Sequence, residues 1–205
     1  MRKRHIILAA RVLSLVFTPF YLPLLGLGLL FMFSYLSLLP FAYKALVIGL
    51  VYIFTILLPT LLIHIYRRHH GWTLMELGVK ERRMVPYVIS IACYFLCTYI
   101  MKAMHIPHFM GGILIAALCV QIVCALINAW WKISTHTAAI GGVGGALFAF
   151  GEIFSFNPVC WLCLTFIVAG LLGSSRMILR QHSLAQVVAG FWVGAVCSAA
   201  GILLG

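Results

Sequence analysis

The segment NAWWKISTHTAAIGGVGG, residues 128–145, places a cluster of polar groups between two long apolar runs. Lys132, Ser134, Thr135 and His136 fall within five consecutive positions. Ionisable groups are costly to place among apolar membrane helices, and there they usually mark a functional site. The segment therefore raises two questions: which fold holds these polar groups, and what do they do?

The composition predicts a membrane protein. Of the 205 residues, 64% are hydrophobic and only 8% are charged, whereas soluble domains carry about 25% charged residues. Leu-rich runs recur at the length of about 20 residues that a membrane-spanning helix needs, and they lack the alternation of a membrane β-strand. We expect an all-α fold, a polytopic transmembrane helix bundle of six to seven spans, as a single integral membrane domain over residues 1–205.

The expected elements follow from the apolar runs and their breaks. Residues 1–19 are expected to form an N-terminal interfacial helix, because this basic stretch is followed by TPFYLP, in which Pro19 and Pro23 remove backbone donors. Seven spans are expected after it, at about residues 20–37, 41–66, 86–103, 110–130, 136–153, 158–173 and 182–204. The loops at 67–85, 131–135 and 174–181 then share one membrane face, and the N-terminus lies on that face too.

The charged residues narrow the possible functions. The net charge is +11, the chain has no Asp, and its only carboxylate side chains are Glu76, Glu81 and Glu152. Aspartyl-phosphate chemistry is therefore excluded, and we expect no metal site and no cofactor. Basic residues beside a bilayer suit anionic lipid head groups or a phosphate ligand better than nucleic acid. Membrane lipids are the expected partners, and the oligomeric state is left open.

Small residues in the expected 136–153 helix predict close helix packing. Ala138, Gly142 and Ala146 recur every four residues, as do Gly141, Gly145 and Ala149. Small side chains at this spacing let two helix backbones approach each other. The GGVGG stretch is no phosphate-binding loop, because no strand precedes it and no GK[ST] follows it.

A second polar cluster lies in GSSRMILRQHSLAQVVAG, residues 173–190. It holds Ser175, Arg176, His182 and Gln186, and on a helix Gln186 can reach the His182 ring because residues i and i+4 share a face. In the first cluster, Ser134 and His136 stand at the start of a helix, where free N–H groups and the helix dipole suit an anion. Two histidines with basic partners on one face suit phosphate chemistry.

These residues resemble the motifs of the type-2 phosphatidic acid phosphatase superfamily, which shares its core with vanadium haloperoxidases. The family shows KxxxxxxRP, then PSGH, then SRxxxxxHxxxD. Ser175, Arg176 and His182 match the third motif, and ISTH keeps the Ser134 and His136 of the second. The resemblance covers about residues 80–205 and implies a phosphatase-like core there.

The resemblance also implies residue roles. His182 would attack phosphorus and form a phosphohistidine, and His136 would protonate the leaving oxygen. Arg176, Ser134, Ser175 and the backbone near Thr135 would hold the phosphoryl oxygens.

Two positions depart from the family pattern. Its first motif is absent, so Lys132, or else Arg83 with Lys80 in KERRMVP, would supply the missing cation. Gln186 stands where the family has Asp, and it would orient His182 as a neutral relay.

The expected function is that of a lipid phosphatase acting on a phosphate monoester or diphosphate. Polyprenyl diphosphate, phosphatidate, phosphatidylglycerophosphate and a lipid A phosphate are all candidate substrates. The alternatives are a non-catalytic lipid-phosphate-binding protein that has lost the relay carboxylate, and a transporter. A transporter fits less well, because its polar groups would gather near the membrane midplane. The expected location is the bacterial cytoplasmic membrane, crossed several times.

Overall fold

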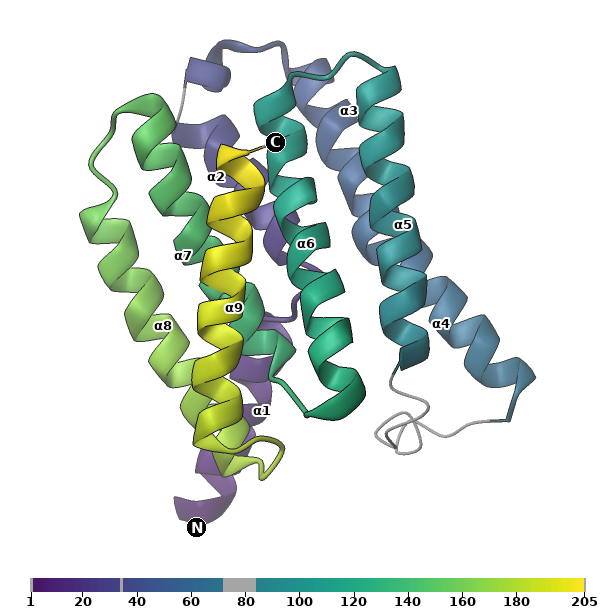
Figure 1. The fold of residues 1–205 in the computed structure, drawn as a ribbon, viewed down its shortest axis with the longest axis vertical. Helices are drawn as coiled ribbons and strands as arrows, with labels where there is room; N and C mark the ends of the chain where they lie inside the picture. Colours follow the sequence, from purple (N-terminus) through teal and green to yellow (C-terminus); the bar gives the residue numbers. More distant parts are fainter. Residues whose placement is uncertain (1, 34, 72–83, 205) are drawn as a thin grey trace. The chain divides into compact units, whose positions relative to one another are not determined.

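The computed structural model describes residues 2–33, 35–71 and 84–204, and within them the protein is helical with no strand. The expected all-α bundle is therefore confirmed (Figure 1). The helices are α1 (Arg2–Val16), α2 (Leu22–Phe33), the 3₁₀ turn η1 (Tyr35–Leu38), α3 (Phe41–Tyr52), the π-helical turn η2 (Ile53–Leu57), α4 (Leu58–His69), α5 (Met84–Ala103), α6 (His108–Trp130), α7 (Thr135–Phe154), α8 (Val159–Ile178) and α9 (Leu184–Leu203).

Six helices in the described part of the chain are long and apolar enough to cross a membrane. They cover Phe41–His69, Met84–Ala103, His108–Trp130, Thr135–Phe154, Val159–Ile178 and Leu184–Leu203. These correspond to six of the seven expected spans. The remaining one, expected at residues 20–37, holds α2, whose 12 residues fall short of the roughly 20 that a straight span needs. The described helices thus give the lower end of the expected range.

The first long span is one continuous helix with a wide turn in its middle. Pro59 has no N–H to donate, and its ring would meet the carbonyl of the residue four positions earlier, Thr55. The backbone changes to wider bonding just before it, where Leu58 N–H donates to the Ile53 carbonyl, a spacing of five that defines a π turn. The Thr55 hydroxyl donates to the Val51 carbonyl at 2.8 Å. The helix therefore continues through a proline that would otherwise break it.

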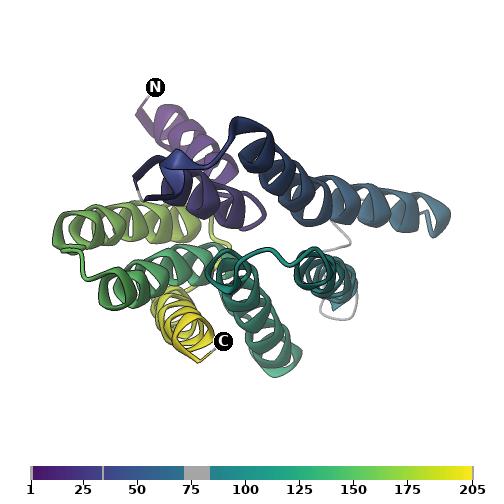
Figure 2. The same cartoon turned by 90° about the horizontal axis from the view of Figure 1, so that it is seen from above.

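The chain divides into two compact units. One consists of residues Met1–Leu22 together with Ile115–Gly205, and the other of Pro23–Leu114. In the second unit, α5 packs along α4 and η2. In the first unit, α8 packs against α1 and α7, and α7 packs most extensively against α9, so that α1, α8, α7 and α9 follow one another when seen end-on (Figure 2). The sequence analysis expected a phosphatase-like core over residues 80–205. The first unit consists instead of residues 1–22 and of the chain from Ile115 onward.

The first unit brings several helix ends together. The start of α7, the end of α8 and the start of α9 lie at one end of the unit, and the N-terminus of the chain lies at the same end (Figure 1). The N-terminal segment is helical, as α1, and its interfacial position stays a prediction. It packs against α8, which the sequence did not predict. Which membrane face this end occupies stays a prediction. The two polar clusters of the sequence belong to this end.

Candidate active site

The geometry of the site begins with the contact between α7 and α9. A β-carbon on Gly194 of α9 would collide with the carbonyl oxygen of Ala138, and one on Gly141 or Gly145 of α7 would collide with the backbone of α9. The two backbones therefore touch without side chains between them. The predicted use of these small residues for close helix packing is confirmed, and their partner helix is α9.

The start of α7 is fixed from both sides. Ser134 is the N-cap, and its hydroxyl accepts a hydrogen bond from Thr137 N–H at 3.5 Å, while the Thr137 hydroxyl donates to the Ser134 carbonyl at 3.0 Å. Ser134 N–H in turn donates to the Gln186 carbonyl oxygen at 3.4 Å. This bond ties the cap of α7 to the first turn of α9. Ser134 is fully buried, and Thr135 and His136 follow it as the first two residues of the helix.

The start of α9 holds His182 through Gln186. The Gln186 side-chain oxygen Oε1 accepts from Ser183 N–H at 3.2 Å, and it lies 3.1 Å from His182 Nδ1. Gln186 N–H donates to the Ser183 hydroxyl at 3.4 Å, which completes a capping box. A backbone N–H can only donate, so the amide group facing it is the oxygen and not the NH₂. The expected contact of Gln186 with the His182 ring is therefore present.

This arrangement sets the tautomer of His182. Because Gln186 Oε1 can only accept, Nδ1 of His182 carries the proton, and Nε2 keeps its lone pair in the neutral ring. An imidazole whose second nitrogen is fixed in this way has the form needed for a nucleophile or a base. The polar group that orients it is neutral and carries no counter-charge.

Arg176 brings the end of α8 and helix α1 to the same place. Its Nη1 donates to the Ser14 hydroxyl of α1 at 2.7 Å. The His136 ring lies near the backbone of Ser14 and within electrostatic range of both Arg176 and His182. The structure thus gathers His136, His182, Gln186 and Arg176, which the sequence had placed in two separate segments.

Two buried nitrogen atoms of this cluster remain without a partner. Arg176 Nε and His136 Nδ1 form no hydrogen bond with any described residue. A buried donor that is left unpaired costs about 1–3 kcal/mol, and more when the group is charged. A ligand that offers oxygen atoms would remove that cost. The cluster therefore offers nitrogen atoms with which the oxygens of an oxyanion could form hydrogen bonds.

The other expected phosphate-binding residues are less well placed. The hydroxyl of Ser175 is buried and donates to the Leu171 carbonyl of its own helix at 2.8 Å. Lys132 is exposed in the short loop before α7. Lys80 and Arg83 lie outside the described residues. Lys132 is thus the candidate for the missing cation that lies among the described residues.

Sequence reasoning missed two residues at this end of the unit. Ser14 was treated as part of an interfacial helix, and Asn128 as the end of an apolar span. Asn128 lies in the last turn of α6, is 4% exposed, and its Oδ1 has no partner among the described residues. Ser14 and Asn128 each lie within an apolar stretch of their helix, and a polar residue in such a stretch is the signal that could have found both. Within the described ranges no three His, Cys, Asp or Glu side chains come together as a metal site would require.

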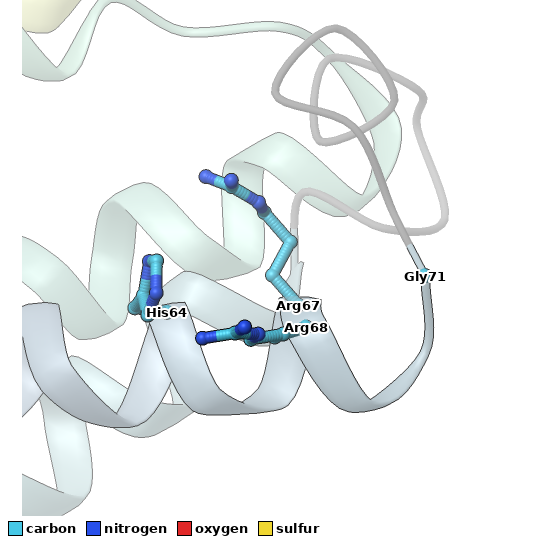
Figure 3. Close-up of a pocket in the computed structure, with 4 residues that line it drawn as sticks. All are labelled: His64, Arg67, Arg68 and Gly71. Carbon is cyan, nitrogen blue, oxygen red and sulfur yellow. The ribbon is translucent and has the colours of Figure 1, made fainter.

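A different basic group lies in the other unit, at the end of α4. His64, Arg67, Arg68 and Gly71 line an open pocket of about 340 Å³ (Figure 3). His64, Arg67 and Arg68 come from the last two turns of α4, where cations are stabilised by the helix dipole, and Gly71 follows the helix. This fits the role of charges that fix the orientation of a helix end at a membrane surface.

Comparison with known proteins adds no relative: no family model, no curated protein and no solved structure matches the chain.

Proposed function

We propose that this protein is an integral membrane lipid phosphatase that hydrolyses a phosphate monoester or diphosphate through a phosphohistidine. One observation carries the proposal. Gln186 Oε1 is shared between Ser183 N–H and His182 Nδ1, so Nε2 is the ring nitrogen of His182 that carries the lone pair, and the His136 ring is near both His182 and Arg176. The helical membrane bundle supports a lipid substrate, because a lipid can keep its tails in the bilayer while its phosphate reaches a helix end.

The proposed first step transfers the phosphoryl group to the protein. His182 Nε2 attacks phosphorus, an N–P bond forms, and the bond from phosphorus to the lipid oxygen breaks. His136, which becomes protonated once the anionic phosphate has bound beside it, gives its proton to that leaving oxygen. Arg176 and the first backbone N–H groups of α7 stabilise the charge on the remaining phosphoryl oxygens, as preorganised donors do in acyl and phosphoryl transfer. The Gln186 oxygen stabilises the positive ring of His182.

The proposed second step releases phosphate. Neutral His136 takes a proton from a water molecule, and the oxygen of that water attacks the phosphohistidine. The N–P bond breaks, its electron pair returns to His182 Nε2, and inorganic phosphate leaves. His136 is again protonated, so both histidines return to their starting state.

A panel of lipids tests the proposal. The purified chain in lipid nanodiscs is given phosphatidate, phosphatidylglycerophosphate, a polyprenyl diphosphate or lipid A, and released phosphate is measured. We expect release from at least one lipid, and an acid-labile, alkali-stable phosphoryl group on the protein after rapid quenching. His182→Ala should abolish both signals. His64→Ala, a histidine change at the end of α4, should keep both, and a His182→Ala protein with normal turnover would refute the proposal.

The alternative function is a non-catalytic lipid-phosphate-binding protein. The neutral Gln186 favours it, because a carboxylate would stabilise a charged His182 more strongly than an amide does. Equilibrium binding separates the two functions. A wild-type protein that binds the lipids in the panel, competes for them with inorganic phosphate, and releases no phosphate from any of them would establish the alternative.

A further inference from the structure

We propose that Ser14 of α1 is a positioning residue of this phosphate site, which makes the N-terminal helix a part of the catalytic unit; the inference rests on the proposed function. Ser14 would hold the guanidinium group of Arg176 in the orientation that binds phosphoryl oxygens. It acts through Arg176 and does not itself touch the reacting atoms.

The packing of α1 singles out Ser14. Ala10 and Ser14 are the buried residues among those described in this helix, at 4% and 7% exposed. They lie four positions apart, on one face, and α1 packs against α8. Apolar residues such as Leu8 and Val12 are exposed instead. The helix therefore turns its small, partly polar stripe toward the protein and its large apolar side chains outward, where membrane lipid can cover them.

Ser14 contacts the cation that the proposed reaction uses. Its hydroxyl accepts from Arg176 Nη1 at 2.7 Å across 162 positions of sequence. Its backbone lies near the His136 ring. Ser14 itself lies outside every motif of the sequence.

The geometry of a guanidinium explains the effect. Arg has five N–H donors in one rigid plane, so fixing Nη1 on Ser14 restricts the directions of the others. Arg176 Nε is buried and has no partner among the described residues, and it is one of the donors left for a ligand. A donor that is oriented before the substrate arrives needs no reorganisation during the reaction, and such preorganisation is a main source of rate enhancement.

A purely structural role is the competing explanation. A hydrogen bond between membrane helices contributes only about 0.6 kcal/mol on average, so the Ser14 hydroxyl could serve simply to dock α1 on α8. The two roles predict different measurements. A docking bond changes the stability of the protein, whereas a positioning bond changes the turnover and the affinity for a phosphate analogue at unchanged stability.

The experiment compares Ser14→Ala, Ser14→Thr and Ser198→Ala in full-length protein in nanodiscs. Ser198 is a matched control, since it is 3% exposed and belongs to the later part of α9, away from the histidine. Three quantities are measured: the thermal unfolding midpoint, the dissociation constant of orthovanadate, and kcat and KM on the lipid that wild-type protein hydrolyses fastest.

We expect Ser14→Ala to lower kcat and to weaken orthovanadate binding, each by about tenfold, which corresponds to about 1.4 kcal/mol. KM should change little, because the lost interaction orients a group for the transition state. Ser14→Thr should restore both values, and Ser198→Ala should match wild type. If Ser14→Ala lowers only the unfolding midpoint, or changes nothing, the inference is wrong. If wild-type protein neither binds orthovanadate nor releases phosphate, the proposed function fails and the inference falls with it.

Discussion

Two groups of histidine and arginine side chains in this molecule differ in how they are assembled. His136 comes from α7, Arg176 from α8 and His182 from the turn before α9. Arg176 donates a hydrogen bond to Ser14, and His182 Nδ1 donates one to Gln186 Oε1. The group at the end of α4 comes from two turns of a single helix, and its His64 and Arg68 are exposed. The first group includes buried nitrogens without partners, whereas the second lines an open pocket.

The difference shows that residue type alone does not make a site. Exposed arginines at a helix end need no ligand, since water, lipid head groups and the helix dipole already stabilise them. Buried donors that converge from separate helices have a free-energy cost, which a fold retains where some ligand or reaction offsets it. Convergence and burial therefore favour the first group as the candidate site, although both groups have similar composition.

The largest effect is expected from Gly194→Ala, which would force α7 and α9 apart and so disrupt the first group. The new β-carbon would collide with the Ala138 carbonyl oxygen and lie 2.6 Å from the carbonyl carbon; both are backbone atoms that no side-chain rotation can move. We expect the free energy of unfolding to fall by about 3 kcal/mol or more, and turnover to be lost with the fold. Denaturation in mixed micelles measures the stability.

Gly170→Ala is the matched control for that change. Gly170 belongs to α8, and a β-carbon on it would meet no atom within 4 Å. Alanine should therefore leave stability unchanged or raise it by up to about 1 kcal/mol, since glycine is the poorer helix former. Equal losses in the two variants would contradict the importance of the α7–α9 contact.

Replacing one arginine from each group tests the comparison directly. Arg176→Gln removes a buried donor near His136 and should lower kcat by about 10²–10³-fold, as the loss of one preorganised donor does elsewhere. Arg68→Gln removes an exposed charge, and turnover should stay within about twofold, in line with the small worth of exposed charges. Phosphate release from the best lipid substrate measures both. A larger loss from Arg68→Gln would move the site to the other unit.

Changes at Gln186 test how the first group orients His182, the proposed nucleophile. Gln186→Leu removes the acceptor that holds the Nδ1 proton of His182, and we expect a loss of about ten- to a hundredfold in kcat. Gln186→Asp supplies a charged acceptor and should hold or raise the rate. Single-turnover kinetics isolates the chemical step. Unchanged kinetics for Gln186→Leu would mean that this side chain serves only as a helix cap.

The smallest expected effect concerns the turns that follow α4 and α8. Both turns use a left-handed residue: Gly71, with φ of 65°, after α4, and Arg180, with φ of 53°, after α8. Side chains other than glycine are strained there by about 1–2 kcal/mol. Arg180→Gly should therefore raise the unfolding free energy by about 1 kcal/mol, and Gly71→Ala should lower it by a similar amount. Opposite signs from these would show that contacts, and not backbone strain, control the two turns.

Local patterns predicted much of the fold and part of the site. The apolar runs predicted the six long helices, because a span must satisfy its backbone internally over a fixed length. The small residues around Gly141 and Gly145 predicted a close helix contact, and the spacing of His182 and Gln186 predicted theirs. The first two signals lie within one helix, where the period is known, whereas His182 and Gln186 meet across the N-cap of α9.

Contacts between distant segments could not be predicted in this way. The bond from Arg176 to Ser14 joins residues 162 positions apart, and nothing in the periodicity of α1 indicates which helix it meets. The same limit applies to the sharing of Gln186 Oε1 with Ser183 N–H, which depends on where α9 begins. Helix partners follow from three-dimensional packing, and a single sequence gives only the faces that are available for it.

The π turn at Ile53–Leu57 also determines the direction in which the basic side chains at the end of α4 point. A π turn holds one residue more than the α-helical turn it replaces. Removing one residue there would rotate everything after it by about 100° around the helix axis, and His64, Arg67 and Arg68 would then face a different side of the helix.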